Sequence, residues 1–172
     1  MPVTYNLIAS NTLSTTATVV TFSSIPGTYT DLLVKYSMRT DTAGANAAQV
    51  RLTFNGNATN YSNVRLQGTG TTVSSSYVSG AAYFEVEAGS PSAGNTANTF
   101  NSTEIYIPNY TVATNKSLGA FEVGENNSTT AYMSVRAALW QNTSAITSIA
   151  LTANAGNFVA NSSFWLYGIK NS

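Results

Sequence analysis

Apolar and polar residues alternate along most of this chain. Between residues 31 and 39, Leu32, Val34 and Tyr36 occupy every second position, after the turn sequence IPG. A period of two is typical of a β-strand with one buried face. No stretch keeps the 3.6-residue apolar period of a helix over three turns. The pattern therefore predicts an all-β protein.

The same alternation predicts about ten strands, separated by turns rich in Gly, Asn, Ser and Thr. They are Thr4–Ala9, Ala17–Ser23, Asp31–Arg39, Gln49–Asn55, Asn63–Gln67, Ala81–Glu87, Glu104–Pro108, Leu118–Gly124, Ala131–Trp140, Thr147–Thr152 and Phe164–Ile169. This number of short strands indicates an antiparallel β-sandwich. For 172 residues we expect an eight-stranded jelly roll with extra edge strands.

Three stretches without an apolar period are expected to be long loops: residues 41–48, 68–76 and 88–99. The last of them, AGSPSAGNTANT, consists of small and polar residues, so we expect it to be the most mobile. The stretches are too short to be interdomain linkers, and the chain has no internal repeat. We therefore expect a single domain over residues 1–172.

The alternation also predicts which side chains form the core. The expected core residues are Leu32, Val34, Tyr36, Val50, Leu52, Phe54, Val135 and Leu139. In the segment 131–140 this choice points Val135 and Leu139 inward, and it points Arg136 and Trp140 outward.

Composition excludes several classes of function. Charged residues make up only 8% of the chain and the formal net charge is zero, so no electrostatic attraction to nucleic acid or an anionic membrane is expected. Cysteine and histidine are both absent. Their absence excludes disulfides, thiolate catalysis, histidine-based triads and zinc sites with histidine ligands. No apolar run approaches the ~20 residues that cross a bilayer.

The carboxylates do not form a convincing catalytic or metal site. Glu85 and Glu87 share one face of a strand, whereas the two acids of a glycosidase normally come from different elements in a cleft. Asp31 and Asp41 flank a strand, but no Asp-x-Asp calcium loop accompanies them. We expect two solvated glutamates and an Asp31 that caps the turn before its strand.

The lysines give no stronger indication. Ser-Lys catalysis would require Lys35, Lys116 or Lys170 to be buried beside a serine, and each lies in a polar or terminal context. The sequence GTG at 68–70 lacks the strand-to-helix setting of a phosphate-binding loop. The sequence therefore predicts no enzyme, no cofactor and no metal site.

Large aromatic side chains fall on the polar side of several predicted strands. They are Tyr83, Tyr106, Tyr132 and Trp140, and Arg136 belongs to the same predicted face. Large rings on a nominally exposed face indicate a contact surface, for another protein or for stacked sugar rings. We favour protein contact, and expect these residues to form the interface of a homotrimer. The alternative is a monomer whose own loops cover this face.

Four blocks of the sequence resemble a known family. TFSSIPGTYTDLLVKYSMRTD, RLTFNGNATNYS, EIYIPNYTVATNKSL and SSFWLYGIKNS, in this order, look like a family of small proteins from tailed bacteriophages, especially phages of aquatic bacteria. Family members are described as virion structural or fibre-associated proteins. The resemblance covers the chain from Thr12 to Ser172 and brings no catalytic motif.

The resemblance implies a non-enzymatic structural protein of the virion surface, assembled in the host cytoplasm. The specific expectation is a capsid decoration protein (a cement or head-fibre protein) that contacts the major capsid protein or other virion proteins. Such proteins are often trimeric, so the expected assembly is a homotrimer, or else a trimer that forms on the capsid. The alternative is a receptor- or carbohydrate-binding module of a tail fibre that binds a host-surface glycan. A glycosidase is disfavoured because histidine is absent and paired carboxylates are scarce.

Overall fold

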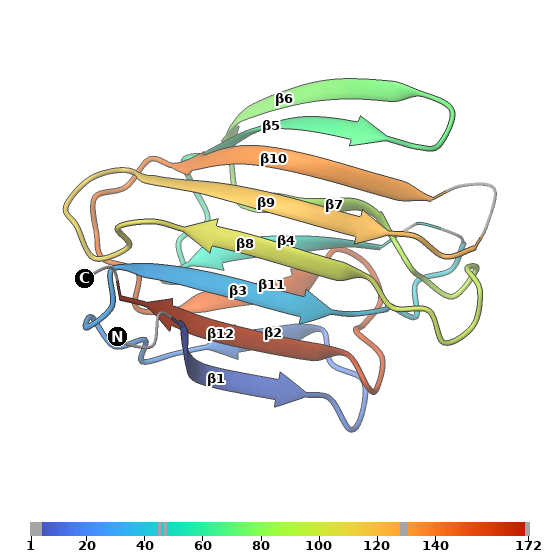
Figure 1. Cartoon of the computed structure of the whole chain (residues 1–172), viewed down its shortest axis with the longest axis horizontal. Coiled ribbons are helices and arrows are strands. Elements are labelled where there is room, and N and C mark those ends of the chain that lie inside the picture. The colour runs from blue at the N-terminus through green and yellow to red at the C-terminus, as the bar shows by residue number, and fades with distance from the viewer. Residues whose placement is uncertain (1–4, 45, 47, 128–130, 171–172) are drawn as a thin grey trace.

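The computed structural model describes residues 5–44, 46, 48–127 and 131–170, without the side chains of Glu87 and Ala88. Within these ranges every regular element is a strand (Figure 1). The strands are β1 (Tyr5–Thr12), β2 (Val19–Phe22), β3 (Asp31–Ser37), β4 (Ala48–Phe54), β5 (Tyr61–Gly68), β6 (Val73–Ala81), β7 (Phe84–Ser90), β8 (Ser102–Ile107), β9 (Lys116–Gly124), β10 (Tyr132–Trp140), β11 (Ile149–Ala153) and β12 (Ser163–Ile169). In this part of the chain no helix has the length and apolar character needed to cross a membrane.

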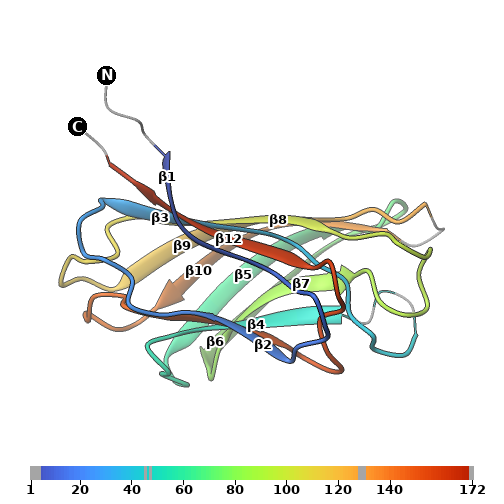
Figure 2. The same ribbon diagram turned by 90° about the horizontal axis from the view of Figure 1, so that it is seen from below.

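The strands form two antiparallel sheets packed face to face. The larger sheet has eight strands in the order β1-β12-β3-β8-β9-β10-β5-β6, and the smaller has four in the order β2-β11-β4-β7. Figure 2 shows the two layers edge-on, with β5 and β6 running obliquely to β3 and β12 because the larger sheet is twisted. The predicted all-β antiparallel sandwich is confirmed.

The strand order supports the jelly-roll form, which stays a prediction. The strands β1-β12-β3-β8 of the larger sheet accompany β2-β11-β4-β7 of the smaller one, and β1 to β4 alternate between the two sheets. Such alternation is expected of two interleaved Greek keys. The remaining strands β9, β10, β5 and β6 extend the larger sheet on one side only. Figure 1 shows β5 and β6 extending past β7, the last strand of the smaller sheet.

The core lies between the two sheets. Six of the predicted core residues are buried there: Leu32, Val34, Tyr36, Val50, Leu52 and Phe54. An aromatic cluster closes one end, where the Trp140 ring stacks on Tyr61 at 6.0 Å and lies 5.3 Å from Phe54. The Tyr61 hydroxyl accepts a hydrogen bond from the Phe54 amide (2.9 Å).

The predicted orientation of β10 is wrong. Val135 is 46% exposed and Leu139 is only partly buried, whereas Arg136 and Trp140 point inward and are buried. The period of two is correct, but apolar residues occur at both the odd-numbered and the even-numbered positions of β10. Side chains on a strand change faces when the register shifts by one residue. The inward set is favoured because Trp140 fills the aromatic cluster and Arg136 meets a buried carboxylate, Glu122.

Two predicted loops differ from the structure. The stretch 68–76 contains the first half of β6, which pairs with β5 although it is rich in serine and exposed on both faces. Residues 91–99 do form a loop, but hydrogen bonds hold it. The Asn95 side-chain oxygen accepts hydrogen bonds from the amides of Asn46 (2.7 Å) and Ser92 (2.9 Å). These contacts oppose the mobility expected of this loop.

Candidate functional site

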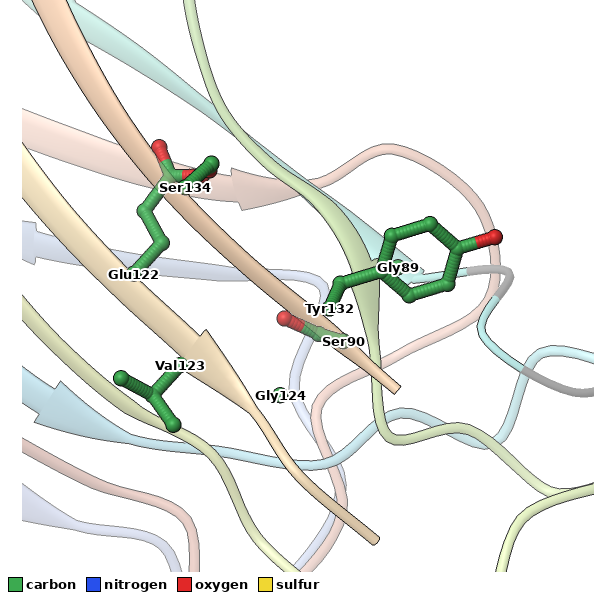
Figure 3. Close-up of a pocket in the computed structure, with 7 residues that line it drawn as sticks. All are labelled: Gly89, Ser90, Glu122, Val123, Gly124, Tyr132 and Ser134. Carbon is green, nitrogen blue, oxygen red and sulfur yellow. The ribbon is translucent and has the colours of Figure 1, made fainter. Parts of the chain in front are cut away.

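The five predicted interface residues do not share a face. Trp140 is 1% exposed in the core, and Arg136 is buried on the inner side of the larger sheet. Tyr106 lies on the outer side of that sheet and is 43% exposed. Tyr83 lies between β6 and β7, and the half-buried Tyr132 lies over Gly89 (Figure 3). The prediction of a common exposed face is therefore wrong, because it assigned the inward-pointing side chains of β10 to the outer side.

The exposed side of the larger sheet carries a different group of apolar residues. We call it the outer apolar face and define it as Val64, Leu66, Tyr77, Phe121, Met133 and Val135. Each of these side chains is between 44% and 70% exposed. They are contiguous because Leu66 pairs with Val135, which in turn pairs with Phe121. Strands β6, β5, β10 and β9 together form this surface.

Two adjacent rows of paired residues, each crossing the larger sheet from strand to strand, change between apolar and charged side chains. One inner row runs through Leu166, Val34, Ile105, Ala120, Arg136, Arg65 and Ser76, and the adjacent outer row runs through Trp165, Lys35, Glu104, Phe121, Val135, Leu66 and Ser75. From β8 to β5 the inner row changes from apolar residues to Arg136 and Arg65, while the outer row changes from the charged Glu104 to apolar residues. Along these two rows, β10 and β5 thus present apolar side chains away from the smaller sheet, whereas Trp140 and Tyr61 of the same strands lie in the core.

The charges beside the outer apolar face compensate one another. The Lys35 ammonium lies 2.6 Å from a carboxylate oxygen of Glu104, and the hydrogen bond raises the pKa of Lys35. The Tyr106 hydroxyl donates a 2.7 Å hydrogen bond to the Asp31 carboxylate, which raises the pKa of Tyr106 to about 12. The face therefore offers an approaching partner apolar area and no excess charge.

A charged cluster lies on the opposite, inner side of β9 and β10. Arg136 Nε is 2.7 Å from Glu122 Oε1, and both side chains are at most 5% exposed. The Ser134 hydroxyl donates a hydrogen bond to Glu122 Oε2. Figure 3 shows Ser134 and Glu122 side by side on the two strands. Sequence reasoning missed this cluster of Arg136, Glu122 and Ser134, because the cluster depends on the register of β9 and β10 that places Ser134 opposite Glu122.

Two glycines allow β7 to approach this cluster closely. A Cβ atom on Gly89, whose φ is +106°, would lie 2.3 Å from the Tyr132 ring, and one on Gly124 would lie 2.9 Å from the Gly89 carbonyl oxygen. Figure 3 shows the resulting niche, whose volume of about 10 Å³ is sufficient for roughly one water molecule. The niche is too small for an organic substrate.

A larger polar cleft lies where β5 and β6 extend past β7. Its volume is about 330 Å³. The lining residues are Asn63, Arg65, Ser76, Val78, Ala81, Ala82, Tyr83, Glu85 and Arg136. Arg136 Nη1 is 3.9 Å from Glu85 Oε1 and 3.5 Å from Asn63 Oδ1. The Arg51 guanidinium packs on the Tyr83 ring at 4.6 Å.

The carboxylates considered as catalytic or metal-binding groups have structural partners. Asp31 is buried and accepts hydrogen bonds from the Asn109 amide and the Tyr106 hydroxyl. Asp41 accepts hydrogen bonds from the side chain and amide of Asn157, which lower the pKa of Asp41. Over the described ranges, no three potential metal-binding residues of the His, Cys, Asp and Glu types come together. Glu85 lines the cleft, whereas the side chain of Glu87 lies outside the described residues.

Of the three lysines, Lys116 is deeply buried. Its ammonium group donates hydrogen bonds to the backbone carbonyls of Val112 (2.7 Å) and Thr143 (3.5 Å), and burial lowers its pKa. These carbonyls hold the loop before β9 against the loop after β10. Lys35 is exposed and paired with Glu104. Lys116 therefore has a structural role in joining the two loops.

No family model matches this chain, and comparisons with curated proteins and with solved structures find no match either. The resemblance to tailed-phage virion proteins thus stays an expectation. The outer apolar face and the polar cleft are the two surface features that bear on function.

Proposed function

We propose that this protein is a non-enzymatic structural protein that assembles through its outer apolar face, as a capsid decoration protein on the surface of a tailed-phage particle. The observation that carries the proposal is the contiguous group of exposed apolar side chains on the outer side of β5, β9 and β10. Leu66, Phe121 and Val135 lie in one cross-strand row there, and each is between 44% and 53% exposed.

The energetic reason is the cost of leaving this surface in water. Burying apolar surface contributes about 25 cal/mol per Å², and contiguous exposed apolar patches mark contact sites on soluble proteins. The six residues of the outer apolar face lie on four adjacent strands, so one flat partner surface could cover all of them at once. The inner charged cluster supports these strands from behind through the Arg136–Glu122 pair.

The partner that fits best is another copy of this chain. The outer apolar face carries no ionisable side chain except the tyrosine phenol of Tyr77, and the neighbouring charges Lys35 and Glu104 neutralise each other. A matching partner must therefore be apolar and uncharged, which the same face of a second copy is. The resemblance favours a homotrimer, whereas direct packing of this face on itself gives a twofold dimer. Either assembly buries the face.

Two measurements test this function. Light scattering over a concentration series should give a mass of two or three chains, and cryo-electron microscopy of particles containing the protein should place it on the head with the outer apolar face buried. That contact would be with another copy or with the major capsid protein. A location at the tail tip with this face in solvent would contradict the proposal.

The second candidate function is a receptor- or carbohydrate-binding module of a tail fibre. The polar cleft favours it, because arginine, asparagine and glutamate side chains converge there on a volume of about 330 Å³. A glycan array tests this function directly. Binding of a defined glycan by a protein that stays monomeric would favour it over assembly.

A further inference from the structure

The polar cleft exists because the two sheets differ in width. The smaller sheet ends at β7, while β5 and β6 continue the larger sheet beyond it (Figure 1). Except at Tyr61, which packs on Phe54 of the smaller sheet, the inner side of these strands extends past the opposing sheet. Asn63, Arg65 and Ser76 form one wall of the cleft, and Tyr83 and Glu85 form the other. A site at the edge of the sandwich is open to solvent without any movement of the chain.

Two arginines lie side by side on the inner wall. Arg136 of β10 and Arg65 of β5 are direct cross-strand partners, an arrangement in which like charges repel. Arg136 is 5% exposed, and its Nη2 has no hydrogen-bond partner among the described side chains and backbone groups. The buried Nε of Arg65 likewise has no partner among them. Buried guanidinium groups normally have their hydrogen bonds satisfied.

The described carboxylates only partly compensate these two guanidinium groups. Glu122 pairs with Arg136 from behind, on the β9 side. Glu85 approaches Arg136 to 3.9 Å, and its side chain is 34% exposed. Among the described carboxylates, none forms an ion pair with Arg65. The cleft is thus lined by two arginines that have N–H donors unpartnered within the described ranges and by one carboxylate acceptor, Glu85.

We propose that this cleft binds a sugar that carries a carboxylate, such as a hexuronate. The ligand carboxylate would accept hydrogen bonds from Arg65 and Arg136, because guanidinium groups bind carboxylates through paired, charge-assisted hydrogen bonds. The sugar hydroxyls would donate to Glu85 and interact with Ser76 and Asn63. A volume of about 330 Å³ is at the small end of ligand sites and suits one sugar ring.

A sugar fits better than an acidic peptide because the cleft offers an acceptor as well as donors. Glu85 can accept hydrogen bonds from the hydroxyl groups of a sugar, and an aspartate or glutamate side chain carries no such donors beside its carboxylate. Stacking is not the main contribution, since Arg51 already packs on Tyr83. This site goes beyond assembly through the outer apolar face, which lies on the other side of the same sheet.

The test is a titration of the full chain followed by amide chemical shifts in nuclear magnetic resonance. Glucuronate should give saturable shifts at β5, β6 and β7. Glucose, which has the same ring without the carboxylate, should give none, and acetate should bind more weakly than glucuronate. The absence of saturable shifts with glucuronate would overturn the proposal, and so would an equal response to glucose. Acetate binding as tightly as glucuronate would overturn the assignment to a sugar.

Variants of Arg65 connect the binding to the cleft. Because Arg65 is half-exposed, Arg65→Gln should fold, and it should weaken glucuronate binding at least about tenfold. Arg65→Lys, which keeps the charge without the planar fork, should give an intermediate loss and serves if the first variant is unstable. Lys35→Gln removes a cation outside the cleft and should leave binding unchanged. Unchanged binding in both Arg65 variants would place the ligand elsewhere and overturn the proposal.

Discussion

At the residue scale, the buried pair Arg136–Glu122 is the most consequential contact of the added strands. Two charges removed from water are tolerated because their atoms lie 2.7 Å apart and Ser134 donates a further hydrogen bond to Glu122. The exposed pair Lys35–Glu104 has a similar distance, but both side chains are more than 40% exposed. Water and salt screen the exposed pair, so it contributes far less to stability.

We therefore expect Glu122→Gln to be strongly destabilising. It leaves the Arg136 charge buried without its closest counterion, which should lower the free energy of unfolding by about 3–5 kcal/mol. Glu104→Gln is the matched control and should cost at most about 1 kcal/mol. Urea denaturation of the two variants measures both values. Equal losses for the two would show that Arg136 is not held by Glu122.

Asp41 gives a pH-dependent prediction at the same scale. Hydrogen bonds from Asn157 stabilise the charged carboxylate, so its pKa in the folded protein should lie below the ordinary value of 3.8. The stabilisation is then present above pH 3.8 and is lost as the pH falls through the folded pKa. A carboxyl titration by nuclear magnetic resonance should show the lowered pKa, and Asn157→Ala should return it towards 3.8. A wild-type value at or above 3.8 would contradict this account.

At the element scale, two strands with the same sequence pattern differ in whether their alternating apolar side chains are buried. In the smaller sheet β4 buries Val50, Leu52 and Phe54, and in the larger sheet β5 exposes Val64 and Leu66. Both strands show the same period of two in sequence. Their difference arises from what covers them, since β4 lies against the larger sheet and β5 extends past the smaller one.

This difference predicts unequal effects of the same substitution in the two strands. Leu52 is fully buried, so Leu52→Ala should cost about 2–5 kcal/mol through lost burial and the cavity it leaves. Leu66 is 53% exposed, so Leu66→Ala should change the stability of the isolated chain by no more than about 0.5 kcal/mol. Reversible denaturation at low protein concentration compares them. A large loss for Leu66→Ala in a monomer would mean that the face of β5 is misassigned.

The positions of the strands could be predicted from sequence far better than their orientation. Every predicted strand overlaps a strand of the structure, because alternation detects half-buried strands such as β3. β6 was missed because its serines give neither face an apolar period. The orientation of β10 could not be decided, because side chains on both of its faces are partly apolar. The cleft depends on the pairing of Arg136 with Arg65, residues far apart in the chain, which no local pattern contains.

At the scale of the whole molecule, the larger sheet serves two purposes. Its first half, with β3, β8 and β12, buries apolar side chains against the smaller sheet and forms the core. Its second half, with β9, β10 and β5, buries Trp140 and Tyr61 at one end but exposes Leu66, Phe121 and Val135 on its outer side, and it turns Arg65 and Arg136 to the cleft. We propose that this outward side is a contact surface between copies of the chain.

Sedimentation equilibrium of two matched variants tests that claim most directly. Val135 on the outer apolar face is 46% exposed, and Val19 on β2 of the smaller sheet is 48% exposed. An aspartate at either position is therefore comparably solvated in the monomer. We expect Val135→Asp to give a monomer, while Val19→Asp and the wild type keep the mass of an oligomer. A wild-type protein that is monomeric at high concentration would contradict the claim, as would a Val135→Asp variant that associates like the wild type.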